Sequence, residues 1–95
     1  MNIRYVMRRV HVIIKGNVQG VFFRAHISEH AKVLGINGWV KNTEEGVEAV
    51  FEGENEKIKD MLEFCALGPK GARVKKIDVA EQSYAGEFDD FIIEY

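Results

Sequence analysis

A glycine-punctuated stretch carries the clearest chemical signal in this sequence. Residues 15–24 read KGNVQGVFFR, leave an apolar strand pattern and enter a helical pattern, with Arg24 where the helix starts. A helix N-terminus disfavours a cation, because aligned peptide dipoles and unpaired N–H groups leave partial positive charge there. An arginine at this end indicates an anion held between the guanidinium and the loop backbone. We expect a phosphate or a carboxylate, since a guanidinium can bind two oxygens at once.

The same loop also permits a second interpretation. In it, Gly16 and Gly20 only turn the chain and Arg24 points into water. The loop has neither the glycine spacing of a dinucleotide-binding motif nor a Walker lysine. Taken alone, the loop therefore leaves an anion site and a plain turn both open.

A second motif has the residue types of a metal site. Residues 26–30 read HISEH and match H-x-x-E-H, a zinc-hydrolase pattern in which two histidines one turn apart face one metal. The predicted helix is short, its apolar stripe uses Ile27 and Ala31, and only His11 remains as another histidine. We therefore expect His26 and His30 to flank a buried stripe, and we expect no metal.

The remaining side chains offer little acid–base machinery. Cys65 falls on a predicted apolar helix stripe with Met61 and Leu62, so we expect a core residue and not a nucleophile. No serine, histidine and acid form a recognisable triad, and we expect no cofactor. Hydrolysis of an acyl phosphate fits these limits, because its carboxylate leaving group, with a pKa of roughly 4, departs without a proton. The protein then has to bind the phosphoryl group and place a water in line.

Apolar periodicity predicts the elements that must position this loop. Strand patterns occur at 10–15, 36–42, 47–52, 74–79 and 88–95, and helical patterns at 23–34 and from 53 to 67. The order is strand, helix, strand, strand, helix, strand, with an extra terminal strand. This order predicts an α+β ferredoxin-like sandwich, with both helices on one face of an antiparallel sheet. We expect residues 1–95 to form a single domain.

Two long motifs fall in register within this pattern. Residues 16–24 (GNVQGVFFR) resemble the G-x-V-Q-G-V-x-F-R signature of the acylphosphatases, and residues 38–42 (GWVKN) resemble their G-W-V-x-N signature. The similarity continues through 67–69 (LGP) and 91–95 (FIIEY), so it covers essentially the whole chain from about Arg9. The resemblance implies a ferredoxin-like fold and hydrolysis of acyl phosphates to a carboxylate and inorganic phosphate.

The resemblance also implies roles for single residues. Arg24 would bind the phosphoryl oxygens and Asn42 would orient the attacking water. Backbone N–H groups would form the phosphate cradle, from Val18, Gln19, Gly20, Val21 and Phe22. The family's proposed mechanism has the substrate itself accept the water's proton, which agrees with the missing general base. The pattern also places Asn42 at the end of a strand, on the side of Val40. The other interpretation of Asn42 is a turn-starting residue before Thr43.

One departure from the first signature bears on affinity. Asn17 occupies a place where many members of the family have arginine, which removes a nearby cation and should weaken substrate binding. Residues 1–8 have no counterpart that we can align.

Composition limits the other functions. The chain is 46% hydrophobic and 29% charged, with a formal net charge of −2, which argues against a nucleic-acid or membrane-surface binder that works by bulk charge. With one cysteine and no long apolar run, we expect a cytoplasmic protein. We also expect a monomer with no nucleic-acid or membrane partner, and the resemblance implies a small acyl phosphate as substrate and inorganic phosphate as product.

Two alternatives remain open. One is an RNA-binding ferredoxin-like module using the open sheet face, which residues 47–52 (VEAVFE) disfavour because they are acidic where such a module needs basic residues. We expect Trp39 and the phenylalanines to belong to the core and not to a base-stacking platform. The other alternative is a regulatory domain that binds an anion without turnover.

Overall fold

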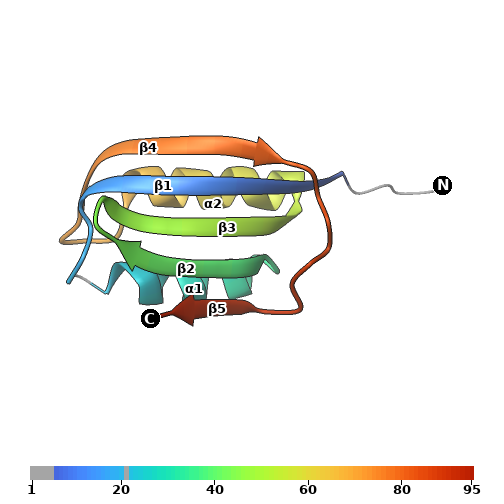
Figure 1. The fold of residues 1–95 in the computed structure, drawn as a ribbon, viewed down its shortest axis with the longest axis horizontal. Coiled ribbons are helices and arrows are strands. Elements are labelled where there is room, and N and C mark those ends of the chain that lie inside the picture. Colours follow the sequence, from blue (N-terminus) through green and yellow to red (C-terminus); the bar gives the residue numbers. More distant parts are fainter. Residues whose placement is uncertain (1–5, 21) are drawn as a thin grey trace.

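The computed structural model describes residues 6–20 and 22–95. Within them, five strands form one sheet and two helices cover one of its faces (Figure 1). The elements are β1 (Met7–Asn17), α1 (Phe23–Val33), β2 (Asn37–Thr43), β3 (Gly46–Glu54), α2 (Asn55–Leu67), β4 (Arg73–Gln82) and β5 (Phe91–Glu94). This order and the ferredoxin-like arrangement confirm the prediction. Neither helix in this described part is long and apolar enough to cross a membrane.

The sheet is mixed, so the expectation of an antiparallel sheet is wrong at one edge. The strand order is β4-β1-β3-β2-β5, and β2 pairs with β5 in parallel while the other neighbours are antiparallel. The reason is the route of the chain after β4. Residues 83–90 run past the ends of the strands to the opposite edge, so β5 enters in the direction of β2 (Figure 1). This crossing also uses residues 88–90, and the last strand therefore begins at Phe91 and not at residue 88.

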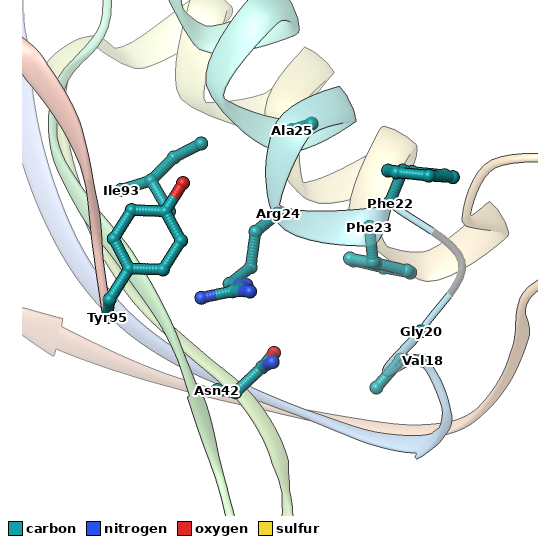
Figure 2. Close-up of a pocket in the computed structure, with 9 residues that line it drawn as sticks. All are labelled: Val18, Gly20, Phe22, Phe23, Arg24, Ala25, Asn42, Ile93 and Tyr95. Atoms are coloured by element: carbon teal, nitrogen blue, oxygen red, sulfur yellow. The ribbon is translucent and has the colours of Figure 1, made fainter.

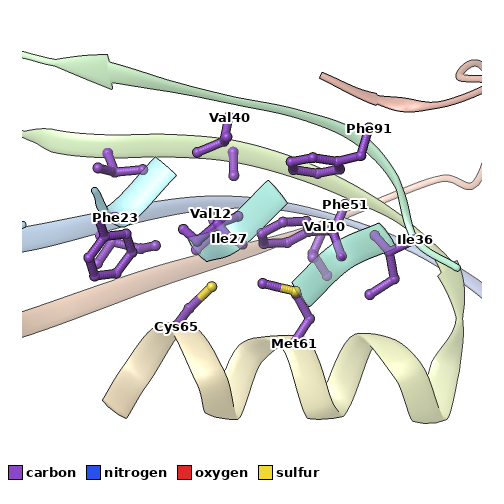
Figure 3. Packing of buried hydrophobic residues seen from close by; sticks show 14 of the residues in the cluster. Val10, Val12, Phe23, Ile27, Ile36, Val40, Phe51, Met61, Cys65 and Phe91 are labelled. Carbon is purple, nitrogen blue, oxygen red and sulfur yellow. The ribbon is translucent and has the colours of Figure 1, made fainter. Parts of the chain in front are cut away.

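The core lies between the sheet and the helices. Val10, Val12 and Ile14 alternate along β1 and are fully buried, as expected for an interior strand. Figure 3 shows side chains of α2 pointing at these strands, among them Met61 and Cys65. Burial raises the pKa of the Cys65 thiol to about 12. Cys65 is therefore a neutral core residue, as predicted, and not a nucleophile.

Two glycines allow backbones to approach closely next to the segment between β1 and α1 and the turn between β2 and β3. Gly16 has φ +136° and lies where a Cβ would overlap the carbonyl oxygen of Arg73. Gly46 has φ +149° at the start of β3, where a Cβ would overlap the carbonyl oxygen of Ile14. A larger residue at either position would push apart strands that hold the loop and the turn.

A buried carboxylate holds the chain segment that leads to β5. Glu52 on β3 is only 3% exposed. Its carboxylate accepts hydrogen bonds from the backbone N–H groups of Ala85 (3.0 Å), Gly86 (3.2 Å) and Glu87 (2.9 Å), and from Arg9 Nη1 (3.4 Å). Burial pushes the pKa of Glu52 up, but these donors outweigh it and the pKa is lower than usual. Glu52 therefore fixes the crossing segment as an ionised group.

Candidate active site

A cavity of about 480 Å³ lies where the β1–α1 loop, the end of β2 and β5 meet (Figure 2). Arg24 and Asn42, which come from the two separate motifs, both line it. The other lining residues are Val18, Gly20, Phe22, Phe23, Ala25, Ile93 and Tyr95. The fold thus brings together the two side chains that the sequence analysis expects to bind the phosphoryl group and to orient the attacking water.

Arg24 stands on the first turn of α1 and is anchored by β5. Its Nη1 donates to the carbonyl oxygen of Glu94 at 3.3 Å, and its guanidinium carbon lies 4.9 Å from the centroid of the Tyr95 ring. Among residues 6–20 and 22–95, no carboxylate forms an ion pair with Arg24. The first turn of α1 also lacks an acidic residue. A half-buried cation beside a helix N-terminus, with no protein anion against it, favours an anionic ligand.

Asn42 lies on the face of β2 that carries the helices, one residue before the strand ends at Thr43, so the prediction that Asn42 closes this strand is wrong by one residue. It pairs with Val47, and it shares its side of the strand with the buried Val40, as predicted. Figure 2 shows its amide pointing into the cavity toward the Arg24 guanidinium. Its side chain is exposed and makes no hydrogen bond with any other described part of the protein. The amide is therefore free to bind water or a ligand.

Val18, Gly20 and Phe22, from the segment between β1 and α1, line the cavity. Val18 is fully buried, Gly20 has φ +73°, and Phe22 has φ +58°. Left-handed residues in such a loop are typical of concave anion sites built from backbone N–H groups. Val21, which the sequence also assigned to the cradle, lies outside the described residues.

The acylphosphatase family model matches residues 10–93. The chain belongs to the acylphosphatase family. It is 52% identical over 91 residues to an acylphosphatase of Syntrophus aciditrophicus (strain SB), with 95% of each chain covered. It is 49% identical over 89 residues to an acylphosphatase of Pyrobaculum aerophilum, covering 92% of this chain and 94% of that protein. The structure of an acylphosphatase from Coxiella burnetii is similar at a TM-score of 0.87 and 36% identity, covering 93% of each chain. These findings confirm the family, the fold and the enzymatic activity that the two motifs predict.

Sequence reasoning missed one side chain of this acylphosphatase loop. Gln19 was assigned only a backbone role, yet its side-chain nitrogen donates to the carbonyl oxygens of Thr43 (2.5 Å) and Gly46 (2.9 Å). These two carbonyls bracket the turn that follows Asn42. Gln19 thus ties the loop to the strand end that carries Asn42, and no local pattern could have found partners this far along the chain.

Two expectations about aromatic residues are wrong in this acylphosphatase. Trp39 is only half-buried and lies on the open sheet face, because it alternates with the buried Val40. The Nζ atom of Lys41 lies 5.2 Å from the centroid of its ring. Phe22 is 80% exposed, because it precedes α1 in a left-handed conformation and lines the cavity mouth.

The histidine motif of this acylphosphatase lies on α1. His26 is exposed, and the ring of His30 stacks on Phe64 with centroids 4.2 Å apart. In the described ranges, no group of three histidine, cysteine, aspartate or glutamate side chains could hold a metal ion. A zinc site of the H-x-x-E-H type would need a third ligand here.

Proposed function

We propose that this acylphosphatase binds the phosphoryl group of its substrate between Arg24 and the β1–α1 loop, and that Asn42 orients the attacking water. One observation carries the proposal: the Arg24 guanidinium and the Asn42 amide face the same cavity from different elements. The two residues lie on different elements, α1 and β2, so the tertiary fold and not local sequence brings their side chains together.

Arg24 supplies the charge that holds the phosphoryl group. The bond to Glu94 uses one N–H of Nη1 and leaves the other N–H donors of the guanidinium for phosphoryl oxygens. The positive end of the α1 dipole adds to this charge. Backbone N–H groups of Val18, Gln19, Gly20, Val21 and Phe22 complete the proposed cradle.

Asn42 places the nucleophile without moving a proton. Its amide binds a water so that the water oxygen attacks phosphorus opposite the carboxylate leaving group. The new P–O bond forms, the bond from phosphorus to the carboxyl oxygen breaks, and a phosphoryl oxygen of the substrate takes the water's proton. No histidine, cysteine or carboxylate side chain belongs to the described lining of the cavity, which supports a reaction without a protein base. Because the leaving carboxylate needs no proton, we propose that the reaction needs neither metal nor cofactor.

We further propose that residues 1–95 work as one domain, as a cytoplasmic monomer without nucleic-acid or membrane partners. The net charge of −2 and the burial of the single cysteine, Cys65, support this proposal. Sedimentation velocity of the purified protein, with and without RNA and anionic vesicles, tests it: one species near 11 kDa in every mixture is expected. A dimer or a co-sedimenting complex would contradict it.

The direct test of the proposed site is hydrolysis of benzoyl phosphate in the presence of inorganic phosphate. Phosphate should inhibit competitively, because the cradle binds the phosphoryl group whatever is attached to it. The Arg24→Ala variant should lose both turnover and this inhibition. Purely noncompetitive inhibition by phosphate would contradict the proposed cradle.

A further inference from the structure

Phe22 has an unusual conformation and an unusual exposure for a phenylalanine. It precedes α1 with φ +58° and ψ +27°, makes no side-chain capping bond, and is 80% exposed. A bulky residue with positive φ is strained, because its Cβ crowds the following carbonyl oxygen. Its ring gains no burial that offsets this strain within the described structure. Strain of this kind, in a residue that lines a ligand cavity, points to a role in binding.

The opposite side of the cavity mouth is also apolar. Ile93 and Tyr95 come from the end of the chain, and Figure 2 shows them across Arg24 from Phe22. We call Phe22, Ile93 and Tyr95 the apolar rim. Arg24 and Asn42 form a polar floor between its two sides. The cavity therefore offers an anion-binding floor and a separate hydrophobic opening.

The cavity is larger than a phosphoryl group needs. About 480 Å³ lies within the range of pockets that hold whole small molecules, and a phosphoryl group on the floor occupies only part of it. With the phosphoryl group at Arg24, the acyl group of the substrate must extend toward the mouth. The side chains that it would meet there are those of the apolar rim.

We propose that the apolar rim is an acyl-group subsite that selects acyl phosphates with an aromatic or bulky apolar acyl group over those with a small one such as acetyl. This inference rests on the proposed function, because it takes the phosphoryl group to lie at Arg24. Phe22 is its specificity-determining residue. Its ring contacts the acyl group and takes no part in the transfer of the phosphoryl group to water.

Two non-hydrolysable phosphonates test the subsite without turnover. Phenacylphosphonate carries a benzoyl group and acetonylphosphonate carries an acetyl group, and both offer the same phosphonate to the floor. Calorimetric titration should show tighter binding of the phenacyl compound to the wild type. In Phe22→Asn this preference should fall by about 2- to 10-fold, the effect of losing one aromatic contact. Asparagine tolerates the left-handed conformation, so the loop should keep its shape.

Two control variants distinguish the effect of losing the Phe22 ring from the effect of losing exposed apolar surface elsewhere. Phe22→Tyr keeps the ring and should keep the preference. Val33→Asn changes a side chain that is 81% exposed on the last turn of α1, outside the cavity lining, and should also keep it. Inorganic phosphate should bind the wild type and Val33→Asn equally. The ratio of the two phosphonate affinities is compared within each protein, so a change in the affinity of the cradle for the phosphonate group itself cancels. An unchanged preference in Phe22→Asn, or no preference in the wild type, would overturn the inference.

Turnover of benzoyl and acetyl phosphate distinguishes failure of the subsite from failure of the proposed function. If phenacylphosphonate is preferred through Phe22 but turnover does not depend on Arg24, the subsite stands and the proposed roles of the floor residues fail. If turnover depends on Arg24 but neither phosphonate is preferred, the floor stands and the subsite fails. If both hold, kcat/KM should favour benzoyl phosphate in the wild type, and by less in Phe22→Asn.

Discussion

The side-chain nitrogen of Gln19 lies 2.5 Å from the carbonyl oxygen of Thr43, the residue that follows Asn42. The same nitrogen donates to the carbonyl oxygen of Gly46 at 2.9 Å. The loop that carries the proposed phosphate cradle is thereby fixed to the end of β2, which carries the proposed water-orienting residue. Gln19 thereby fixes the distance between the β1–α1 loop and the end of β2 that carries Asn42.

Replacing Gln19 should therefore lower turnover of the folded protein as well as stability. Gln19→Met keeps the length of the side chain but removes both donors, and we expect kcat for benzoyl phosphate to fall by about 10- to 100-fold, because small misplacements of reacting groups have large effects on rate. The loss of two hydrogen bonds should reduce the free energy of unfolding by about 1–3 kcal/mol. The matched control is Gln82→Met. The Gln82 side chain accepts a hydrogen bond from Arg9 on β1, and Gln82 does not line the cavity. Equal kcat values for the two variants would exclude the positioning role.

Arg24 should not be replaceable by lysine. Arg24→Lys keeps a positive charge but loses the planar arrangement that can contact two phosphoryl oxygens and Glu94 together. We expect a variant with little activity and weakened inhibition by phosphate, measured by benzoyl phosphate hydrolysis. Near-normal turnover in Arg24→Lys would mean that charge alone, and not bidentate binding, is required.

How much of this site is predictable from the sequence depends on the range of each interaction. Arg24 and Asn42 could be assigned because each lies in a motif whose neighbours set its place on a helix or a strand. The bond from Arg24 to Glu94 spans 70 residues, and that from Gln19 to Thr43 spans 24. No local periodicity reports such partners. The parallel direction of β5 was missed for the same reason, since it depends on the route of residues 83–90 and on Glu52, which holds that segment.

The buried carboxylate of Glu52 should make stability depend on pH. Its pKa in the folded state is below its usual value, so its contribution is present above the unfolded-state pKa and is lost as the pH falls through the folded-state pKa. Urea unfolding between pH 7 and pH 3 should therefore show a loss of stability at the acidic end. Glu52→Gln should be less stable by about 1–3 kcal/mol at pH 7 and should show a smaller loss on acidification.

Glu63→Gln provides the control for this experiment, because Glu63 is an exposed glutamate on α2. It should change the free energy of unfolding by less than about 0.5 kcal/mol at any of these pH values. A Glu52→Gln protein with the stability and the pH profile of Glu63→Gln would show that the crossing segment is held by other contacts.

Metal removal should leave turnover intact. Prolonged chelation, and the double change His26→Ala with His30→Ala, should both retain most of the benzoyl phosphate activity, since the leaving carboxylate needs no Lewis acid. Some stability should be lost in the double variant, because His30 stacks on Phe64. A large loss of activity that added zinc restores would instead support a metal site at the histidine motif.

The most direct test of the separate roles proposed for Arg24 and Asn42 compares an alanine variant of each residue. Two quantities are measured for both variants: kcat for benzoyl phosphate and the inhibition constant of inorganic phosphate. Arg24→Ala should lose both turnover and phosphate binding. Asn42→Ala should lose turnover by on the order of 10²- to 10³-fold and keep phosphate binding, because its amide holds the water and not the phosphoryl group.

Asn42→Asp sharpens this comparison. It should be as slow as Asn42→Ala and should also bind phosphate more weakly, because the added carboxylate repels the anion. Circular dichroism should show the wild-type fold in all three variants. Wild-type turnover in Asn42→Ala, or a loss of phosphate binding equal to that of Arg24→Ala, would contradict the roles proposed for the two residues.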